Sequence, residues 1–216
     1  MNTITLPLLT SFYRDYLRYH DLSRFISRTA KHYTQGTLCR LADARNVDTR
    51  RAAALILGFV GTYASNRTLG KLLTDRDRST ALLAETSIKS VWSRDGSEEQ
   101  RHILYDVMRC IAAQNYAEAV RLANILLEEE PLFAEVRNQR AIALFALGQF
   151  QECIDDSTLV LELNPYHFGA AIGMGHAYLQ TDSKEIAVMC FQHALKINPN
   201  LDSVRRHLER MKMDIR

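Results

Sequence analysis

The sequence predicts an all-α protein built as an α-solenoid, in which helical hairpins stack side by side along the chain. Three prolines, Pro131, Pro165 and Pro199, stand 34 residues apart. Such a fixed period is typical of repeated supersecondary units that bury their apolar faces against one another. The 216 residues include only 9 glycines and 4 prolines, which permits long helices and disfavours a turn-rich β architecture.

The composition is that of an ordinary globular protein, with 47% hydrophobic and 24% charged residues. The N-terminus, MNTITLPLLT, lacks the basic stretch and apolar core of a signal peptide. The longest apolar run, Ala52 to Gly61, is too short to span a bilayer. We therefore expect a cytoplasmic protein with no membrane partner. The four scattered cysteines form no C-x-x-C pair, so we expect buried thiols and no zinc site or disulfide.

Charge is distributed unevenly along the chain. Residues 1–95 carry 15 Lys and Arg against 8 Asp and Glu, whereas residues 96–216 carry 12 against 17. This asymmetry predicts two modules with different surfaces, the first of which could attract an acidic partner.

Two helices are expected at the N-terminus, in PLLTSFYRDYLRYH and DLSRFISRTAKHY. Pro7 suits a helix start, and Asp21 suits the N-cap of the second helix. We expect residues 1–34 to cap the open end of the stack.

Two loosely similar helical pairs follow, over residues 35–95. A short helix, GTLCRLADA or NRTLGKLLTD, precedes each longer helix, NVDTRRAAALILGFVG or DRDRSTALLAETSIKSVW. Asn and Asp before the longer helices supply capping oxygens. The first copy resembles short HEAT-like repeats through Arg50, Ala53, Ala54, Leu57 and Gly58. The second copy departs from that pattern, with Thr80 and Ile88 in place of the expected Arg and Gly.

The junction to the 34-residue units is SRDGSEEQ, where Gly96 breaks a helix and Ser97 with Gln100 forms a predicted capping box. The units begin at Gln100, Ala134 and Phe168, and each is expected to form a helix, a turn and a second helix. Each proline then ends a helix, because it lacks an N–H and restricts the residue before it.

Polar residues are expected to shape the turns. Asn164 and Asn198, which precede two of the prolines, suit a helix end because Asn tolerates left-handed backbone geometry. Gly148 is expected in the turn of the middle unit, and Asp182 stands at the same place in the last unit.

The period and pattern resemble the tetratricopeptide repeat over residues 100–199. The segments QNYAEAV, ALGQFQECI, GHAYL and EIAVMCFQHALKINP carry the resemblance. Departures are Val107 and Cys153 at small-residue positions, and Ile103, Arg137 and Ala171 at the usual Trp position. The segment DSVRRHLERMKM predicts a capping helix within residues 200–216, with its apolar face formed by Val204, Leu208 and Met211.

The resemblance implies a concave face, lined by the first helix of each unit, that holds a peptide or helix of a partner. The residues carried onto that face are Arg101, Tyr105, Met108, Asn138, Gln139, Ile142, Phe145, Ile172, His176 and Leu179. Asn138 and Gln139 would bond a peptide backbone, and Phe145 and Met108 would contact its side chains. His176 is expected either to line this groove or to be a buried structural histidine.

A subgroup of such proteins clamps the C-terminal tails of chaperones with Lys, Asn and Arg. The equivalent places in this chain hold Leu104, Met108, Gln139 and Gly173. Because the clamp is missing, a chaperone-tail adaptor is disfavoured.

No active site is found in the sequence. The seven histidines show no metal-ligand spacing, and the GMG of Gly173 to Gly175 lies inside a repeat helix. Acidic pairs such as Asp155 and Asp156 are expected on outward, solvated helix faces. We therefore expect no catalysis, no metal and no cofactor.

The N-terminal helices carry a candidate patch for anionic partners, formed by Arg14, Arg18, Arg24, Arg28 and Lys31. The simplest interpretation is that these cations solubilise the outer face while neighbouring aromatic residues form the core. The predicted function is thus a non-catalytic scaffold or adaptor that binds a protein or peptide in the groove. The alternative is association with nucleic acid through the basic patch, which a salt titration of affinity would reveal.

Overall fold

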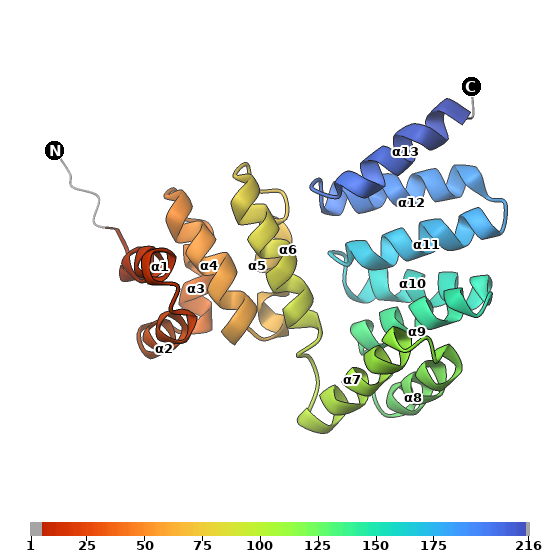
Figure 1. The fold of residues 1–216 in the computed structure, drawn as a ribbon, viewed down its shortest axis with the longest axis horizontal. Helices are drawn as coiled ribbons and strands as arrows, with labels where there is room; N and C mark the ends of the chain where they lie inside the picture. Colours follow the sequence, from red (N-terminus) through yellow and green to blue (C-terminus); the bar gives the residue numbers. More distant parts are fainter. Residues whose placement is uncertain (1–5, 215–216) are drawn as a thin grey trace. The chain divides into compact units, whose positions relative to one another are not determined.

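The computed structural model describes residues 6–214, and within that range every regular element is helical and no strand is found (Figure 1). The all-α prediction is therefore confirmed. The ends of the two predicted capping segments, residues 1–5 and 215–216, lie outside the described residues. The contacts divide the chain into two compact units, one ending at Arg94 and the other beginning at Asp95. None of the described helices combines the length and apolar character that crossing a bilayer requires.

The N-terminal unit follows the predicted order of helices. Up to Arg94 the described elements are α1 (Leu8–Tyr19), α2 (Leu22–His32), α3 (Gln35–Leu41), α4 (Val47–Val60), a 3-10 turn η1 (Tyr63–Ser65), α5 (Asn66–Leu72) and α6 (Arg78–Trp92). The side chains of Asp21, Asn46 and Asp77 accept the backbone N–H three residues on, at the starts of α2, α4 and α6. The predicted N-caps are therefore present, and they set where these helices begin.

Helix α4 is the centre of this unit. It contacts α1, α2, α3, α5 and α6, and Ala52, Ala53, Ile56 and Leu57 on it are fully buried. Its small residues allow neighbours to approach closely. A Cβ at Gly58 would clash with the Ser87 hydroxyl and lie 3.0 Å from the Ser87 Cα of α6, so only glycine fits at this crossing.

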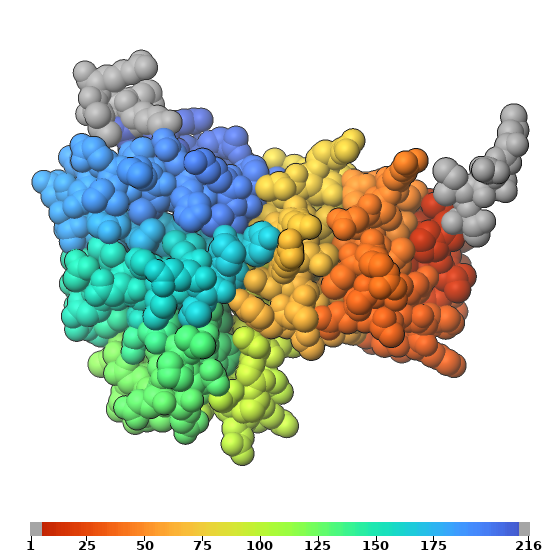
Figure 2. All heavy atoms as spheres, turned by 180° about the vertical axis from the view of Figure 1, so that it is seen from behind, coloured from red at the N-terminus to blue at the C-terminus, as the bar shows by residue number. Residues whose placement is uncertain are grey.

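The C-terminal unit is a stack of helical hairpins, with its described helices α7 (Glu98–Ala112), α8 (Tyr116–Glu129), α9 (Ala134–Ala146), α10 (Phe150–Leu163), α11 (Phe168–Gln180), α12 (Lys184–Ile197) and α13 (Asp202–Asp214). The predicted capping box of Ser97 and Gln100 starts α7. Helix α9 contacts both α7 and α11, so the first helices of successive units lie side by side. The space-filling view shows the hairpins in chain order, from green through cyan to blue (Figure 2).

The turn inside each hairpin repeats one backbone conformation. Gln114, Gly148 and Asp182 have φ values of 59°, 78° and 57°, all in the left-handed region. In each case the next N–H bonds the carbonyl five residues back, as in Asn115 to Cys110 at 2.8 Å. This bond is typical of the Schellman motif, which satisfies the free carbonyls at the end of the first helix.

The end of the second helix differs from the prediction. Asn164 and Asn198 are extended, with φ of −139° and −131°, rather than left-handed. The proline that follows each Asn confines its backbone to the extended region. The two side chains act in a different way, because each accepts the N–H two residues on, from Tyr166 at 3.2 Å and from Asn200 at 3.0 Å. These bonds turn the chain toward the next unit.

Helix α13 packs against the last hairpin. Val204 and Leu208 join Ala187 and Phe191 of α12 in one buried cluster, and Met211 packs on its edge. The apolar stripe of α13 thus packs against α12, and the charged residues of α13 lie outside that stripe.

Candidate functional site

The ten residues predicted to line the groove lie on α7, α9 and α11, but they differ in accessibility. Tyr105 and Ile142 are 50% and 43% exposed, and His176 is also exposed. Ile142 and His176 occupy equivalent places 34 residues apart on α9 and α11, and so do Tyr105 and Gln139 on α7 and α9. The accessible part of the predicted groove is therefore a row of residues that continues from one repeat to the next. We call Tyr105, Ile142 and His176, with Gln139 beside them, the interaction row.

Several other predicted groove residues support the stack. Met108 packs against the core shared by α7, α8 and α9, and Ile172 and Leu179 pack against the cluster of α12 and α13. The ring of Phe145 lies 5.5 Å from that of Phe150. These side chains are half-buried, so much of their surface is already used by neighbouring helices.

The two amides predicted to bond a peptide backbone are engaged within the protein. Asn138 and Gln139 both donate to the Glu135 carboxylate, at 3.3 and 2.6 Å. Asn138 is only 8% exposed, whereas Gln139 is half-buried. A partner can therefore reach Gln139 far more readily than Asn138.

Glu135 also belongs to a buried polar network that the sequence did not reveal. His167 Nε2 lies 3.1 Å from Glu135 Oε2, and its Nδ1 accepts the Ala170 N–H at 3.0 Å. Because Nδ1 is an acceptor, the ring proton is on Nε2 and is donated to the carboxylate. Both side chains are buried, at 2% and 6% exposure. The network joins the first turn of α9 to the start of α11. It therefore helps to hold these two helices, which carry Ile142 and His176, next to each other.

The structure contradicts the prediction that Asp156 lies on a solvated helix face. This residue was predicted to face solvent with Asp155, but it is buried on α10. Arg140 donates to both of its oxygens at 2.7 Å, and Arg137 donates at 3.3 Å. The two arginines lie three residues apart on one face of α9, so this pair of helices is joined by a buried ionic contact.

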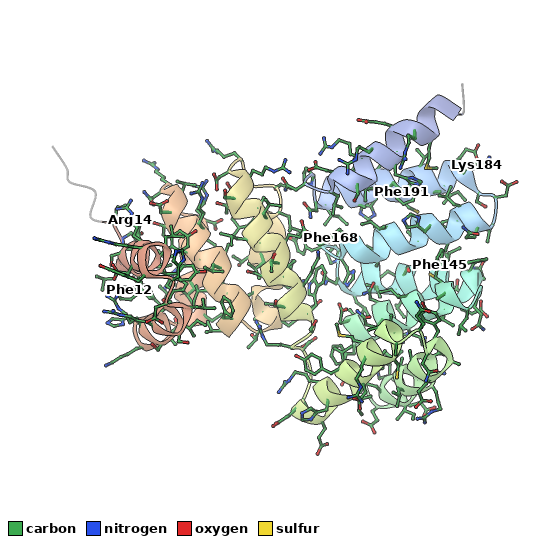
Figure 3. The ribbon with its side chains drawn as sticks, viewed as in Figure 1. Phe12, Arg14, Phe145, Phe168, Lys184 and Phe191 are labelled. Carbon is green, nitrogen blue, oxygen red and sulfur yellow. The ribbon has the colours of Figure 1, made fainter. Side chains whose placement is uncertain are left out.

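His176 stands among aromatic rings at the end of the interaction row. Its ring centroid lies 5.1 Å from that of Phe191, 5.7 Å from that of His207 and 6.5 Å from that of Phe145. Figure 3 labels Phe145 on α9 and Phe191 on α12, on either side of α11. Although His176 is exposed at one side, partial desolvation of its ring by these neighbours, with a smaller effect of His207, lowers the pKa of His176. This shift favours the neutral imidazole.

The predicted basic patch is partly neutralised by internal ion pairs. Arg14, labelled on α1 in Figure 3, donates to Asp48 at 2.9 Å. Arg28 donates to Asp15 at 2.7 Å and lies 4.0 Å over the ring of Phe12. The remaining cations of the patch, Arg18, Arg24 and Lys31, are exposed.

The structure shows no site for a metal in the part of the chain it describes, where no group of three or more His, Cys, Asp or Glu comes together. All four cysteines are free. Cys153 and Cys190 are buried, whereas Cys39 and Cys110 are partly exposed, so the expectation of buried thiols is correct for only two of them. Burial raises the pKa of the Cys153 thiol to about 11.

Part of the C-terminal unit matches a known family model. A family model described as "Tetratricopeptide repeat" matches residues 170–201. A TPR repeat-containing protein of Rhizobium etli is 24% identical over 129 residues, which cover 60% of this chain and 63% of that protein. This chain therefore matches less than two thirds of the length of that relative.

Two solved structures share the fold. The first TPR of Spaghetti, bound to an HSP90 peptide, has a TM-score of 0.53 at 20% identity, over 56% of this chain and 95% of that chain. The Sgt2 TPR domain from Aspergillus fumigatus has a TM-score of 0.52 at 22% identity, over 55% of this chain and 80% of that chain. None of these matches confirms the HEAT-like resemblance of the N-terminal unit.

Proposed function

We propose that this chain, whose C-terminal unit carries tetratricopeptide repeats, is a non-catalytic scaffold that binds a segment of a partner protein on α7, α9 and α11. The observation that carries the proposal is the exposed row of Tyr105, Ile142 and His176, with Gln139 beside it, on helices whose other faces are fixed by internal contacts. Because these helices are already formed, a flexible partner loses less entropy when it docks on them than when it docks on a mobile surface.

The chemistry of the row supports a partner with apolar anchors. A tyrosine, an isoleucine and a neutral imidazole offer apolar contact area, and the Gln139 amide adds one polar group. Arg101, the one cation in the predicted groove, donates to the Gly96 carbonyl at 2.7 Å. An amphipathic helix or an extended peptide with aliphatic side chains fits this surface better than an acidic tail does.

Chaperone C-terminal tails are not proposed as ligands, although the Spaghetti repeat holds an HSP90 peptide. Of the places where the clamp residues would stand, Leu104 is fully buried, and Met108, Gln139 and Gly173 carry no charge. A carboxylate-terminated peptide would find no cation at these places.

The decisive experiment compares two double variants. Tyr105→Ala with Ile142→Ala removes the centre of the row, whereas Ile125→Ala with Met189→Ala removes two exposed apolar residues of the second helices α8 and α12. Proteins captured from the native lysate are quantified by mass spectrometry, and the affinity of the strongest one is measured by calorimetry. We expect the first variant to weaken that affinity by about tenfold or more and the second to leave it unchanged. Equal affinity of the first variant and the wild type would exclude this face.

A further inference from the structure

A second surface with a distinct chemistry lies within the N-terminal unit. The turn from α3 to α4 and the turn from α5 to α6 enclose a hollow of about 720 Å³. Its charged lining consists of the cations Arg45, Arg50, Lys71 and Arg76 and the carboxylates Asp43, Asp75 and Asp77. A volume of this size holds several ligand side chains.

Two of the three carboxylates are already fully used. Asp75 accepts two bonds from Arg50, at 2.7 and 3.0 Å, and the Asp77 N–H at 2.8 Å. Asp77 accepts two bonds from Arg51, at 2.8 and 2.7 Å, and both the N–H and the hydroxyl of Thr80. Bonds from Arg51, opposed by a smaller effect of burial and reinforced by Thr80, hold the pKa of Asp77 far below its usual range. These carboxylates are therefore ionised and are matched by fixed guanidinium groups.

Three of the cations are not matched in this way. Arg45, Lys71 and Arg76 are exposed, and no hydrogen bond or ion pair of their side chains is found among residues 6–214. The fourth, Arg50, donates its remaining Nη1 group to the carbonyls of Ala44 and Arg45, at 3.0 and 3.1 Å. This bond fixes the turn that carries Arg45. The third carboxylate, Asp43, is also exposed and has no side-chain partner among residues 6–214. Three unmatched cations therefore face one unmatched carboxylate, so the hollow has a net positive charge, and the bonds of Arg50 hold its floor.

We propose that this hollow binds an acidic segment of a protein partner, with its carboxylates held by Arg45, Lys71 and Arg76. Guanidinium and ammonium groups form strong charge-assisted bonds with carboxylates. A nucleic acid fits less well, because the lining contains no aromatic side chain on which a base could stack. Separated Asp and Glu side chains of a flexible segment can also match three separated cations one by one.

The site is tested on the full chain with fluorescein-labelled hexaglutamate, by fluorescence anisotropy at low salt. The variant R45Q/K71Q/R76Q removes the three rim cations. The matched control R18Q/R24Q/K31Q removes the same charge from exposed positions of α1 and α2 in the same unit. We expect the rim variant to bind at least about tenfold more weakly and the control to stay within about twofold of the wild type. Unchanged circular dichroism spectra verify the fold of both variants.

Three results would overturn the site: no binding by the wild type, equal loss in both variants, or tighter binding of a single-stranded DNA oligomer that also depends on the rim cations. The conservative variant R45K/R76K should retain most of the affinity, because it keeps the charge. The Tyr105→Ala/Ile142→Ala variant should bind hexaglutamate as the wild type does. Failure at the hollow and failure at the row on α7, α9 and α11 can thus be distinguished.

Discussion

At Asp77, one carboxylate serves two helices. It caps α6 through the N–H and hydroxyl of Thr80, and it holds the guanidinium of Arg51 on α4. Bonds of both kinds favour the ionised form, so the pKa of Asp77 is lowered from its ordinary value of 3.8. The stability that this carboxylate contributes is therefore present above about pH 4 and is lost as the pH falls through the lowered value.

Two substitutions separate the roles of Asp77. Asp77→Asn keeps a capping oxygen but loses the ion pair, so we expect the free energy of unfolding to fall by about 1 kcal/mol at neutral pH. Asp77→Ala loses both and should cost about 2 kcal/mol. The ion pair contributes little because the side chains of Arg51 and Asp77 are 29% and 21% exposed, so solvent partly screens their charges. Urea unfolding followed by circular dichroism measures both changes.

The pH dependence gives an independent check on the same residue. Between about pH 5 and about pH 2 the wild type should lose more stability than Asp77→Asn, because only the wild type must protonate this carboxylate. Parallel stability curves for the two proteins would show that Asp77 contributes nothing through its charge.

At the scale of the helices, small residues decide how closely neighbours pack. A Cβ at Gly175 of α11 would lie 2.8 Å from Phe191 Cε1 on α12, whereas a Cβ at Gly173 meets only the Ser157 hydroxyl, at 4.0 Å. The two glycines stand two residues apart on one helix. They therefore form a matched pair in which helix propensity is the same and packing differs.

Alanine at these two positions should act in opposite directions. Gly175→Ala should destabilise the C-terminal unit by about 1–3 kcal/mol, because Phe191 is fully buried and has little room to move. Gly173→Ala should stabilise it by up to about 1 kcal/mol, since alanine favours the helix and causes no clash. Denaturant midpoints of the two variants decide the matter. A neutral Gly175→Ala would mean that the α11–α12 contact is looser than the structure shows.

At the scale of the whole molecule, each unit has its own buried core. In the C-terminal unit, Leu104 and Val107 of α7 join Ala123 and Leu126 of α8 in one cluster. Similar clusters continue through the later hairpins to α13. Because each repeat contacts mainly its neighbours, such a stack is expected to fold without the other unit.

A fragment of residues 95–216 should therefore keep its helical circular dichroism signal and unfold in one cooperative transition. A shorter fragment that begins at residue 116 lacks α7 and with it Leu104 and Val107, so it should unfold earlier and less cooperatively. A long fragment without cooperative unfolding would show that the C-terminal unit depends on the N-terminal one.

The helices and their order can be predicted from the amino-acid sequence, because the signals for them are local. The N-caps at Asp21 and Ser97, the helix-ending prolines and the 34-residue period each act within a few residues or within one repeat unit. The 34-residue period also predicts that the ten proposed groove residues fall on the first helices of the repeats, α7, α9 and α11. The prediction of a left-handed backbone at Asn164 was wrong. The next residue, Pro165, restricts Asn164 to the extended region, and this restriction outweighs the tolerance of Asn for left-handed geometry.

Which polar side chains remain accessible to a partner depends on how the helices pack against one another. Asp156 is buried and bonded to Arg140, which lies 16 residues away in the sequence. Glu135 is buried and bonded to His167, 32 residues away. Arg14 is bonded to Asp48, 34 residues away. Polar residues that look alike in sequence differ in this way because burial and pairing depend on which helices are brought together. Composition and local periodicity do not predict contacts between residues far apart in the sequence. A capping side chain can be predicted because it bonds a backbone N–H only three residues along the same chain.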